Sequence, residues 1–282
     1  MKTLIIGSDN PLGAELAAKL KAQDIPVINI RSNDKVLDNP RLMLNSFSAN
    51  EPDFVVDLQV SRWLQTDEGE LHKRALRLLK SIARACRTQS AALVHVSSCD
   101  VFAGRRVGFY RETDKPDGEG YSARRLLKAE NYARRRVPQH VVVRPGHLIA
   151  AGEDNELTRI CQQLKNGEQL ETTHDQICPT PVADLARVIT AIIEQLACDA
   201  QAWGVYHYCS AGPLSRFEFA EAIIAQASQY GKGDAELLTR GEGEYGDYNV
   251  ALNCRKLLGA FGIKQRNWRP ALQGLVASAL KK

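Results

Sequence analysis

Three features of the 282-residue sequence predict an α/β fold built on a doubly wound parallel sheet. Short apolar runs alternate with amphipathic helical patterns over residues 1–146, the order expected of βαβ units. Four of the runs end in glycine or polar residues, at Gly7, Asp57, Ser97-Ser98 and Arg144, and the carboxyl ends of parallel strands share one edge of a sheet. A hydrophobic content of 44% is enough for a full core. After residue 146 the alternation weakens, which predicts a smaller C-terminal α/β substrate domain.

The first apolar run ends at Gly7 and leads through a turn into a helix that begins near Ala14. In a Rossmann-type fold such a turn presents backbone N–H groups and a helix N-terminus to a pyrophosphate. We therefore expect Gly7, Leu12 and Gly13 to bind a dinucleotide cofactor, together with Asn10, which stands where G-x-x-G-x-x-G turns have a glycine. Asn tolerates positive φ, so the turn is expected to persist with an altered phosphate contact. A turn without a ligand is the alternative interpretation.

The second predicted strand, 26–30, is followed by Arg31 instead of an acidic residue. An acidic side chain there would bind the ribose 2′-hydroxyl, whereas an arginine suits a 2′-phosphate, so the sequence favours NADP over NAD. After the third strand, 54–56, Asp57 and Leu58 are expected beside the adenine, where bulkier residues than usual would crowd the cofactor.

The remaining elements follow from periodicity. We predict strands at 91–96, 141–145 and 204–208, and helices at 46–51, 70–87, 157–165, 183–198, 216–230 and 271 to the end. The basic residues of the 70–87 helix are interpreted as its solvated face. A cofactor domain is expected over 1–146 and part of 180–210, and a substrate-binding region over 147–179 and 211–282, with a mobile glycine-rich linker at 231–248.

The chemistry is expected in the stretch 94–130. Ser98 ends the fourth strand, and Tyr121 opens an amphipathic helix, so that a hydroxyl and a phenol are expected to meet over one cleft. Arg125 follows Tyr121 by one helical turn. Cys99 has no paired base in view and is interpreted as a buried thiol.

In order and spacing these segments resemble the dTDP-4-dehydrorhamnose reductase family of extended short-chain dehydrogenases/reductases, nearly from end to end. The motifs that carry the resemblance are Ser97-Ser98 with Val101-Phe102 and Gly104, Glu112 with Pro116, Tyr121 and Glu130, Asp175-Gln176 with Pro179-Thr180, and Gly204 to His207. The resemblance implies NADP or NAD as cofactor and a nucleotide-sugar-like substrate between the two domains.

The resemblance also implies roles for single residues. Tyr121 corresponds to the family's proton donor, and Ser98 to the hydroxyl that orients the substrate carbonyl. Arg125 stands where the family has a lysine; it keeps the charge but not the ammonium's contacts. Arg125 and Arg144 are further expected to contact the cofactor. The residues implied at the substrate are Ser97, Cys99, Val101, His147 and Gln176.

Two functions stay open at this point. The first is an NAD(P)-dependent reductase of a nucleotide-sugar-like carbonyl. The second is a catalytically inactive NAD(P)-binding regulatory or scaffold protein that resembles the regulatory beta subunit of methionine adenosyltransferase. The departures at Asn10 and Arg125 and the crowded loop from Asp57 to Gln59 favour this second function. A homodimer and a protein partner are both compatible with the sequence.

Composition excludes other classes. Lysine and arginine total 37 against 33 acidic residues, and the net charge of +4 is too small and too scattered to predict nucleic-acid binding. Seven cysteines, without a C-x-x-C pair, predict free thiols in a reducing compartment. The histidines are scattered, so no metal site is expected. No apolar stretch is long enough for a signal peptide or a membrane span, and a cytoplasmic protein is expected.

Overall fold

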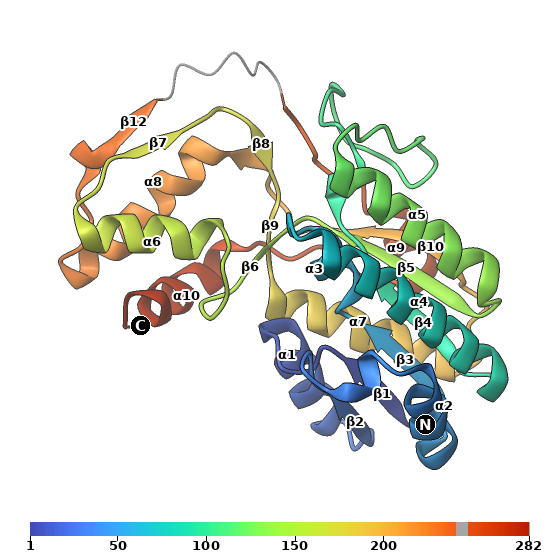
Figure 1. Ribbon diagram of the computed structural model, residues 1–282. Coiled ribbons are helices and arrows are strands. Elements are labelled where there is room, and N and C mark those ends of the chain that lie inside the picture. Colours follow the sequence, from blue (N-terminus) through green and yellow to red (C-terminus); the bar gives the residue numbers. More distant parts are fainter. Residues whose placement is uncertain (241–247, 282) are drawn as a thin grey trace.

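The computed structural model describes residues 1–240 and 248–281 of the chain. It has a larger lobe, in which helices cover both faces of a sheet, and a smaller, mainly helical lobe (Figure 1). Three hydrophobic cores fill the molecule, one on each face of the sheet and one inside the smaller lobe. The predicted α/β class is thus confirmed.

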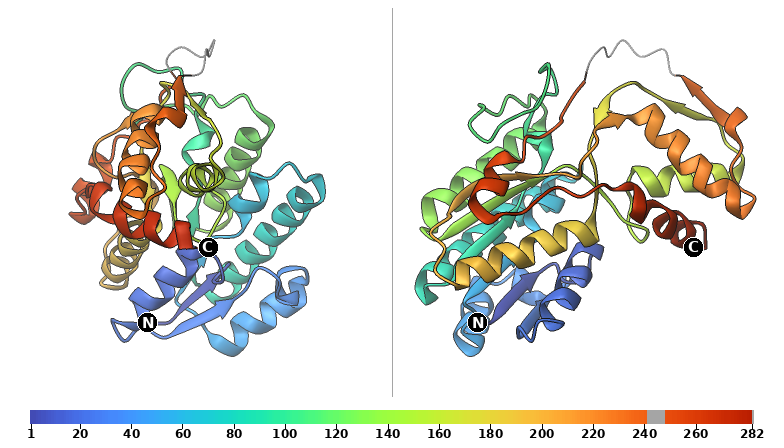
Figure 2. Two further views of the ribbon diagram at one scale, coloured as in Figure 1. Left: turned by 90° about the vertical axis from the view of Figure 1, so that its left-hand side faces the viewer. Right: turned by 180° about the vertical axis from the view of Figure 1, so that it is seen from behind.

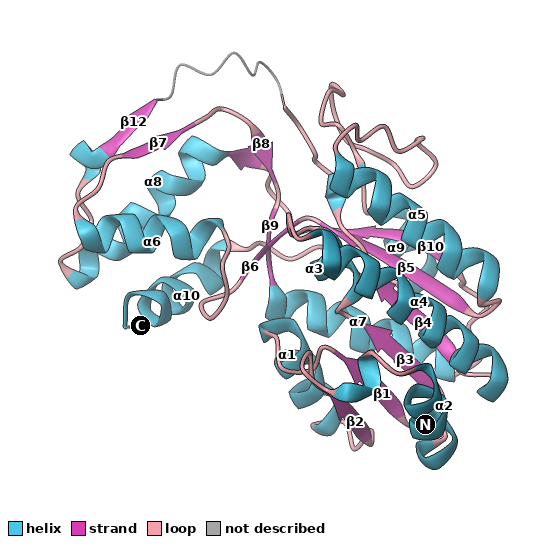
Figure 3. Ribbon diagram, viewed as in Figure 1, coloured by secondary structure: helices cyan, strands magenta, loops and turns pink. Residues whose placement is uncertain are grey.

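The sheet of the larger lobe has six strands in the order β10-β5-β4-β3-β1-β2. All neighbours pair in parallel, and β1 lies between β2 and β3, so the chain winds outward in both directions from this point (Figure 3). The strands are β1 Thr3–Ile6, β2 Val27–Ile30, β3 Phe54–Asp57, β4 Ala92–Val96, β5 His140–Pro145 and β10 Gly204–Tyr208.

Within the described residues, seven helices cover this sheet. Four of the helices pack into the core on one face of the sheet, through Phe47, Trp63, Leu78 and Leu126. The other three helices share the core on the opposite face. The first group is α2 Pro40–Asn50, α3 Val60–Leu64, α4 Gly69–Gln89 and α5 Tyr121–Arg136, and the second is α1 Pro11–Lys21, α7 Val182–Ala197 and α9 Arg255–Phe261.

The smaller lobe packs three helices around Phe219 and Trp268, whose rings meet edge to face with centroids 5.5 Å apart. Its elements are α6 Glu156–Asn166, α8 Arg216–Ala227, α10 Arg269–Lys281 and the short strands β7 Leu170–Thr172, β8 Gln176–Ile177, β11 Leu214–Ser215 and β12 Leu238–Arg240. Two more short strands, β6 His147–Ile149 and β9 Pro179–Pro181, pair between the lobes. The chain crosses back after α9 to finish in α10 (Figure 2).

Among the elements that differ from the sequence prediction are α2, α3, α9 and part of the linker, and α3 stands where a loop was expected. Helix α2 begins six residues earlier than expected, because Asn39 caps it and Pro40 occupies its first turn. Helix α9 was not predicted, and its Phe261 packs into the core of the larger lobe. Part of the expected linker is ordered, since β12 pairs with β7; its residues 241–247 lie outside the described residues. The expected domain boundaries stay a prediction.

Candidate active site

A cleft with a volume of about 500 Å³ lies at the carboxyl ends of β4 and β5, between the two lobes. Ser98 and Gly146 form part of its wall on the side of the sheet, and Arg216 and Phe219 of α8 form part of its wall on the side of the smaller lobe. Ligands of open parallel sheets bind beyond the carboxyl ends of the strands, so this cleft is the candidate active site.

The turn between β1 and α1 has the shape that a phosphate requires. Gly7 adopts φ +83°, which favours glycine. A Cβ on Gly13 would lie 2.5 Å from the Gly7 carbonyl oxygen, so helix and turn pack too closely for a side chain there. Asn10 is different from the expectation: its φ is −81°, and its side chain accepts a hydrogen bond from the Gly13 amide at 2.8 Å. It caps α1 and needs no positive φ, so that part of the prediction was wrong.

Two buried polar atoms at this turn, Nδ2 of Asn10 and Oε1 of Gln59, have no hydrogen-bond partner among the described residues. Both face Gly7, since a Cβ built on that glycine would lie 3.1 Å from the first atom and 3.0 Å from the second. Buried unpaired polar atoms cost stability unless a ligand or water satisfies them. Nδ2 of Asn10 and the N-terminus of α1 therefore fit a bound pyrophosphate as donors, whereas Oε1 of Gln59 can only accept and would need a donor from a water or another part of a ligand.

The residue after β2, Arg31, is exposed, and its neighbour Ser32 is tied to the glycine turn. The Ser32 amide and hydroxyl donate to the Asp9 carboxylate at 2.8 and 2.6 Å. Burial raises the pKa of Asp9, but the bonds from Ser32 outweigh it, so the pKa is lowered and the group is ionised at neutral pH. A 2′-phosphate at this strand end would meet the cation of Arg31 and the anion of Asp9 together.

Three of the predicted cofactor residues are buried by other contacts. Leu12 and Leu58 are 5% and 3% exposed and belong to the core beneath α1 and α7. The Asp57 carboxylate accepts from the Gln59 and Val60 amides at the start of α3, and its other oxygen lies 2.8 Å from Nδ1 of His95. The side chain of Asp57 thus holds the loop after β3 in place instead of reaching toward an adenine.

Ser98 lines the cleft as predicted, and its hydroxyl is already engaged. It donates to Oδ2 of Asp100 at 2.8 Å and accepts from Nε2 of Gln65 at 3.2 Å. The same amide group of Gln65 donates to Asp100 at 2.6 Å. A substrate carbonyl would have to compete with Asp100 for the Ser98 proton.

Tyr121 does not lie in this cleft. Its side chain is 59% exposed, and Cζ of Arg125 lies 3.6 Å from the centre of its ring. The Tyr121 ring also lies beside the His72 ring, and the two ring centroids are 5.3 Å apart. His72 donates from Nε2 to the Thr66 carbonyl at 2.6 Å, and Thr66 lines the cleft, so His72 connects the Tyr121 ring to the cleft wall. The expected meeting of Ser98 and Tyr121 is not present in this structure.

The position of Tyr121 along α5 bears on this outcome. Residues four apart in a helix share a face, and Tyr121 and Arg125 share theirs with Ala129, which is 0% exposed. The neighbouring stripe ends in Leu126 and Glu130, which are also 0% exposed. Tyr121 is therefore exposed because it stands in the first turn of the helix, and not because its stripe faces away from the sheet. The sequence identifies the motif residues, but which turns of α5 are covered depends on contacts with other elements.

Arg144 has a different partner from the predicted cofactor. Its guanidinium donates to both carboxylate oxygens of Glu130, at 2.9 and 2.6 Å, and the pair is buried. The Ser97 hydroxyl donates to the same carboxylate at 2.6 Å. Because His207 Nε2 lies 3.5 Å from the Arg144 guanidinium, which can only donate, that nitrogen is the acceptor and the ring is neutral. These four residues join β4, β5, β10 and α5 beneath the cleft floor.

A cluster that the sequence analysis missed lies beside Ser98. The ligand-type atoms of Cys99, Asp100 and His147 all lie within 4.8 Å of one another, a group that could hold a metal ion. Burial raises the pKa of the Cys99 thiol, and the Asp100 charge adds to the effect, so without a metal the thiol stays protonated. Burial also lowers the pKa of His147, and its Nδ1 has no hydrogen-bond partner in the part of the chain that the structure describes. Residue spacing did not indicate this cluster, because His147 in β6 follows Cys99 and Asp100 by about fifty residues and only the fold brings them together.

The other substrate predictions separate. Ser97, Cys99 and His147 line the cleft, as expected. Val101 is 1% exposed and belongs to the core under α4 and α5 instead, because the short 3₁₀ turn after Ser98 rotates it inward. Gln176 belongs to β8, where its backbone N–H donates to the Tyr248 backbone carbonyl at 2.7 Å. The adjacent Ile177 lines the cleft in place of Gln176.

Ion pairs join the walls of the cleft. Arg62 of α3 pairs with Glu153 from the loop before α6, across the two lobes. Arg216 at the start of α8 pairs with Glu156 at the start of α6. These two arginines are cations in the cleft wall that a diphosphate could bind after displacing their carboxylate partners.

A parallel sheet wound outward from β1, a glycine turn shaped for a phosphate and a cleft against a second lobe define a protein of the extended short-chain dehydrogenase/reductase class. The RmlD substrate binding domain family matches residues 1–280, and the chain belongs to this family. Two curated relatives align over nearly all of the chain. They are the spore coat polysaccharide biosynthesis protein SpsK of Bacillus subtilis, 27% identical over 96% of this chain and 95% of its own, and a dTDP-4-dehydrorhamnose reductase of Aggregatibacter actinomycetemcomitans, 26% identical over 99% of each.

Solved structures agree on the fold. A dTDP-4-dehydrorhamnose reductase ortholog of Clostridium acetobutylicum superposes with a TM-score of 0.84 at 22% identity, covering 98% of this chain and 99% of that chain. The enzyme of Bacillus anthracis, solved in complex with NADP, has a TM-score of 0.80 at 20% identity, covering 98% and 97%. The predicted family is confirmed, and these relatives support the predictions of an oxidoreductase class and of NADP as cofactor. No described helix has the length and apolar character to cross a membrane.

Proposed function

We propose that the protein reduces a carbonyl of a nucleotide-sugar substrate with NADPH, in the cleft between its lobes. The observation that carries the proposal is the match of the RmlD substrate binding domain family over residues 1–280, together with relatives named dTDP-4-dehydrorhamnose reductase, on a chain that keeps a phosphate-shaped turn and a serine at the carboxyl end of β4. NADPH supplies the hydride when it is bound. The pyrophosphate of the cofactor is assigned to the turn at Gly7, with Asn10 as a donor, and the 2′-phosphate to Arg31.

The residues of this chain then have separate tasks. Ser98 hydrogen-bonds the substrate carbonyl oxygen once its proton is released from Asp100. Arg216 binds the diphosphate of the substrate from the smaller lobe. Tyr121 donates the proton, for which its side chain has to turn from the Arg125 stack toward Thr66; its exposure leaves it free to do so.

A second candidate is a protein that binds NADP and a nucleotide sugar without turnover, in order to regulate or scaffold a partner. It is favoured by the outward position of Tyr121 and Arg125 and by the engagement of Arg144 with Glu130. In this case the cleft binds both ligands but lacks a proton donor within hydrogen-bond reach of the substrate.

One experiment separates the two candidates. Binding of NADPH and of dTDP-4-dehydrorhamnose to the purified full chain is measured by calorimetry, and nicotinamide absorbance is then followed with both present. Binding with loss of absorbance supports reduction. Binding without loss of absorbance supports the second candidate, and the absence of NADPH binding contradicts both.

A further inference from the structure

The cations of α4 form a continuous row. Lys73, Arg77, Lys80, Arg84 and Arg87 follow one another at spacings of four and three residues, and all five are exposed. Such spacing puts them on one side of the helix, over about 21 Å at 1.5 Å per residue. We call this row the basic stripe. Only Lys73 has an ion-pair partner among the described residues, Glu70 at 2.6 Å.

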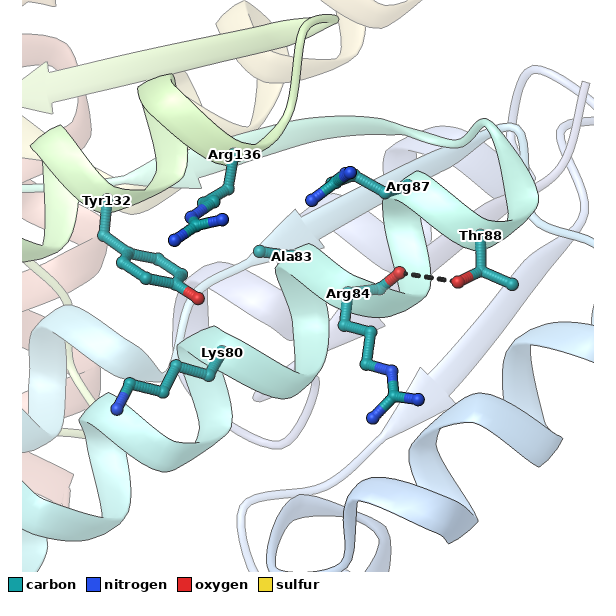
Figure 4. A pocket seen from close by; sticks show the side chains of 7 residues that line it. All are labelled: Lys80, Ala83, Arg84, Arg87, Thr88, Tyr132 and Arg136. Atoms are coloured by element: carbon teal, nitrogen blue, oxygen red, sulfur yellow. Dashed lines mark hydrogen bonds between the residues drawn. The ribbon is translucent and has the colours of Figure 1, made fainter.

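Helix α5 lies beside α4 (Figure 1), and basic residues of both helices line one hollow at their junction. Two hollows follow this junction. One, of about 330 Å³, is lined by Lys80, Arg84, Arg87, Tyr132 and Arg136, and the next, of about 460 Å³, shares Tyr132 and Arg136 with it. In Figure 4, Tyr132 and Arg136 reach over the first hollow from α5, and Arg87 points toward Arg136. We call the two hollows together the basic furrow.

The second hollow continues the positive lining along α5. Arg124, Lys128 and Arg135 line it, and none of them has an ion-pair partner in the part of the chain that the structure describes. Helices α4 and α5 together carry twelve basic and two acidic residues, whereas the whole chain has a net charge of +4. The rest of the chain is therefore net acidic. The premise that the basic residues are scattered was wrong, because α4 and α5 are brought together only by the fold.

Ordinary structural reasons account for only part of this arrangement. Cations near helix C-termini stabilise the helix dipole, which explains Arg87 and Arg136. It does not explain Lys80, Arg84 or Lys128, which lie earlier in their helices. Like charges four residues apart, such as Lys80 and Arg84, destabilise a helix by about 0.2–0.5 kcal/mol a pair. These cations repel one another and have no anionic partner within the described protein, which indicates that an anionic partner outside the protein binds them.

We propose that the basic furrow binds the phosphodiester backbone of a single nucleic-acid strand. A single phosphate group would engage only two or three of the cations, whereas the stripe offers positive charge over the length of several phosphates. The cations line hollows and not a flat face. Tyr132 is the only large aromatic ring among the residues that line these hollows; it is partly buried, and Cζ of Arg136 lies 5.5 Å from its centre. A membrane surface is disfavoured, because Leu127 is the one large aliphatic side chain among the residues that line the two hollows, and it is half-buried. A second copy of this face is disfavoured by like charge.

The test uses the whole chain and a fluorescently labelled DNA strand of about 16 nucleotides, the upper range for single-strand binding folds. Anisotropy titrations should give an association constant that depends on salt. Its logarithm should fall with the logarithm of the salt concentration, with a slope of about 0.7 for each phosphate contact. The variant R84E/R87E/R136E should bind at least tenfold more weakly and with a shallower salt slope. Its matched control, K21E/K232E/K264E, makes the same change of net charge at exposed lysines outside the furrow and should bind within about twofold of the parent chain.

Circular dichroism melting of both variants confirms that they are folded. Equal weakening by the two variants would show that net charge alone attracts the strand and would overturn the proposal. So would the absence of DNA binding at low salt, or binding confined to vesicles rich in phosphatidylserine. A duplex of the same length, run in parallel, should bind no more tightly than the single strand. Activity toward a nucleotide sugar plays no part in these readouts, so the result is independent of the proposed reductase function.

Discussion

The guanidinium carbon of Arg125 lies 3.6 Å from the centre of the Tyr121 ring, and neither residue lines the cleft that Ser98 occupies. In the family's motif this pair would face the substrate. Here it covers the outer surface of α5, while Leu126 and Glu130 hold the inner face of the helix. Whether the phenol can turn inward decides between the two candidate functions.

Tyr121→Phe tests the proton donor. Loss of general acid catalysis should lower kcat by roughly 100-fold or more, whereas the Kd for NADPH should stay unchanged because the ring lies outside the cleft. Steady-state kinetics and calorimetry give the two values. An unchanged kcat would show that another group donates the proton.

Arg216→Gln tests the substrate assignment of the smaller lobe. Loss of a charge-assisted bond to a diphosphate should raise KM for the nucleotide sugar by about tenfold, with NADPH binding unaffected. The control is Arg159→Gln, since Arg159 also lines the cleft but its side chain is 68% exposed. Equal effects of both variants would argue against a specific role for Arg216.

Gly13→Ala tests the packing of the phosphate turn. Its Cβ would meet backbone atoms of Gly7 and Ser8 at 2.5–2.9 Å, so the free energy of unfolding should fall by about 1–3 kcal/mol and NADPH binding should weaken. Urea unfolding measures the first effect. Gly274→Ala is the matched control: Gly274 lies within α10, a Cβ there meets nothing within 4 Å, and a gain of about 0.5–1 kcal/mol is expected.

Glu130→Ala tests the buried pair below the cleft. It leaves the Arg144 guanidinium buried without its anion, and the free energy of unfolding should fall by about 3–5 kcal/mol. Glu119→Ala removes the anion of an exposed pair with Arg105 and should change little, as is usual on surfaces. Similar losses for the two variants would mean that the buried pair has no special role in stability.

The stability should also depend on pH through His207. Burial and the neighbouring Arg144 charge lower its pKa to about 3 in the folded protein, against 6.5 as the ordinary value. Between these values the unfolded chain binds the additional proton, so stability rises with pH and is lost as pH falls from 6.5 toward 3. At pH 5 the loss should be about 2 kcal/mol relative to neutral pH. His207→Gln should flatten this part of the urea-midpoint profile; an unchanged profile would assign the dependence to other groups.

Much of the larger lobe could be predicted from the sequence, because its strands are short apolar runs that end at polar residues or glycine. The positions of Ser98 and Gly13 follow from that pattern. The exposure of Tyr121 does not, since the same stripe of α5 is buried at Ala129, and which turns of the helix are covered depends on the elements packed against it. Contacts between distant segments were equally hidden, such as Asp100 with His147 and the stripe of α4 beside α5, because sequence periodicity describes one element at a time.

The most direct test of the account is nicotinamide absorbance after the full chain is mixed with NADPH and dTDP-4-dehydrorhamnose. We expect the absorbance to fall as the substrate is reduced, and to fall about 100-fold more slowly in Ser98→Ala, which lacks the hydroxyl for the substrate oxygen. If calorimetry shows that both ligands bind and the absorbance stays constant, the cleft is a binding site without turnover, and the proposed reductase function is wrong.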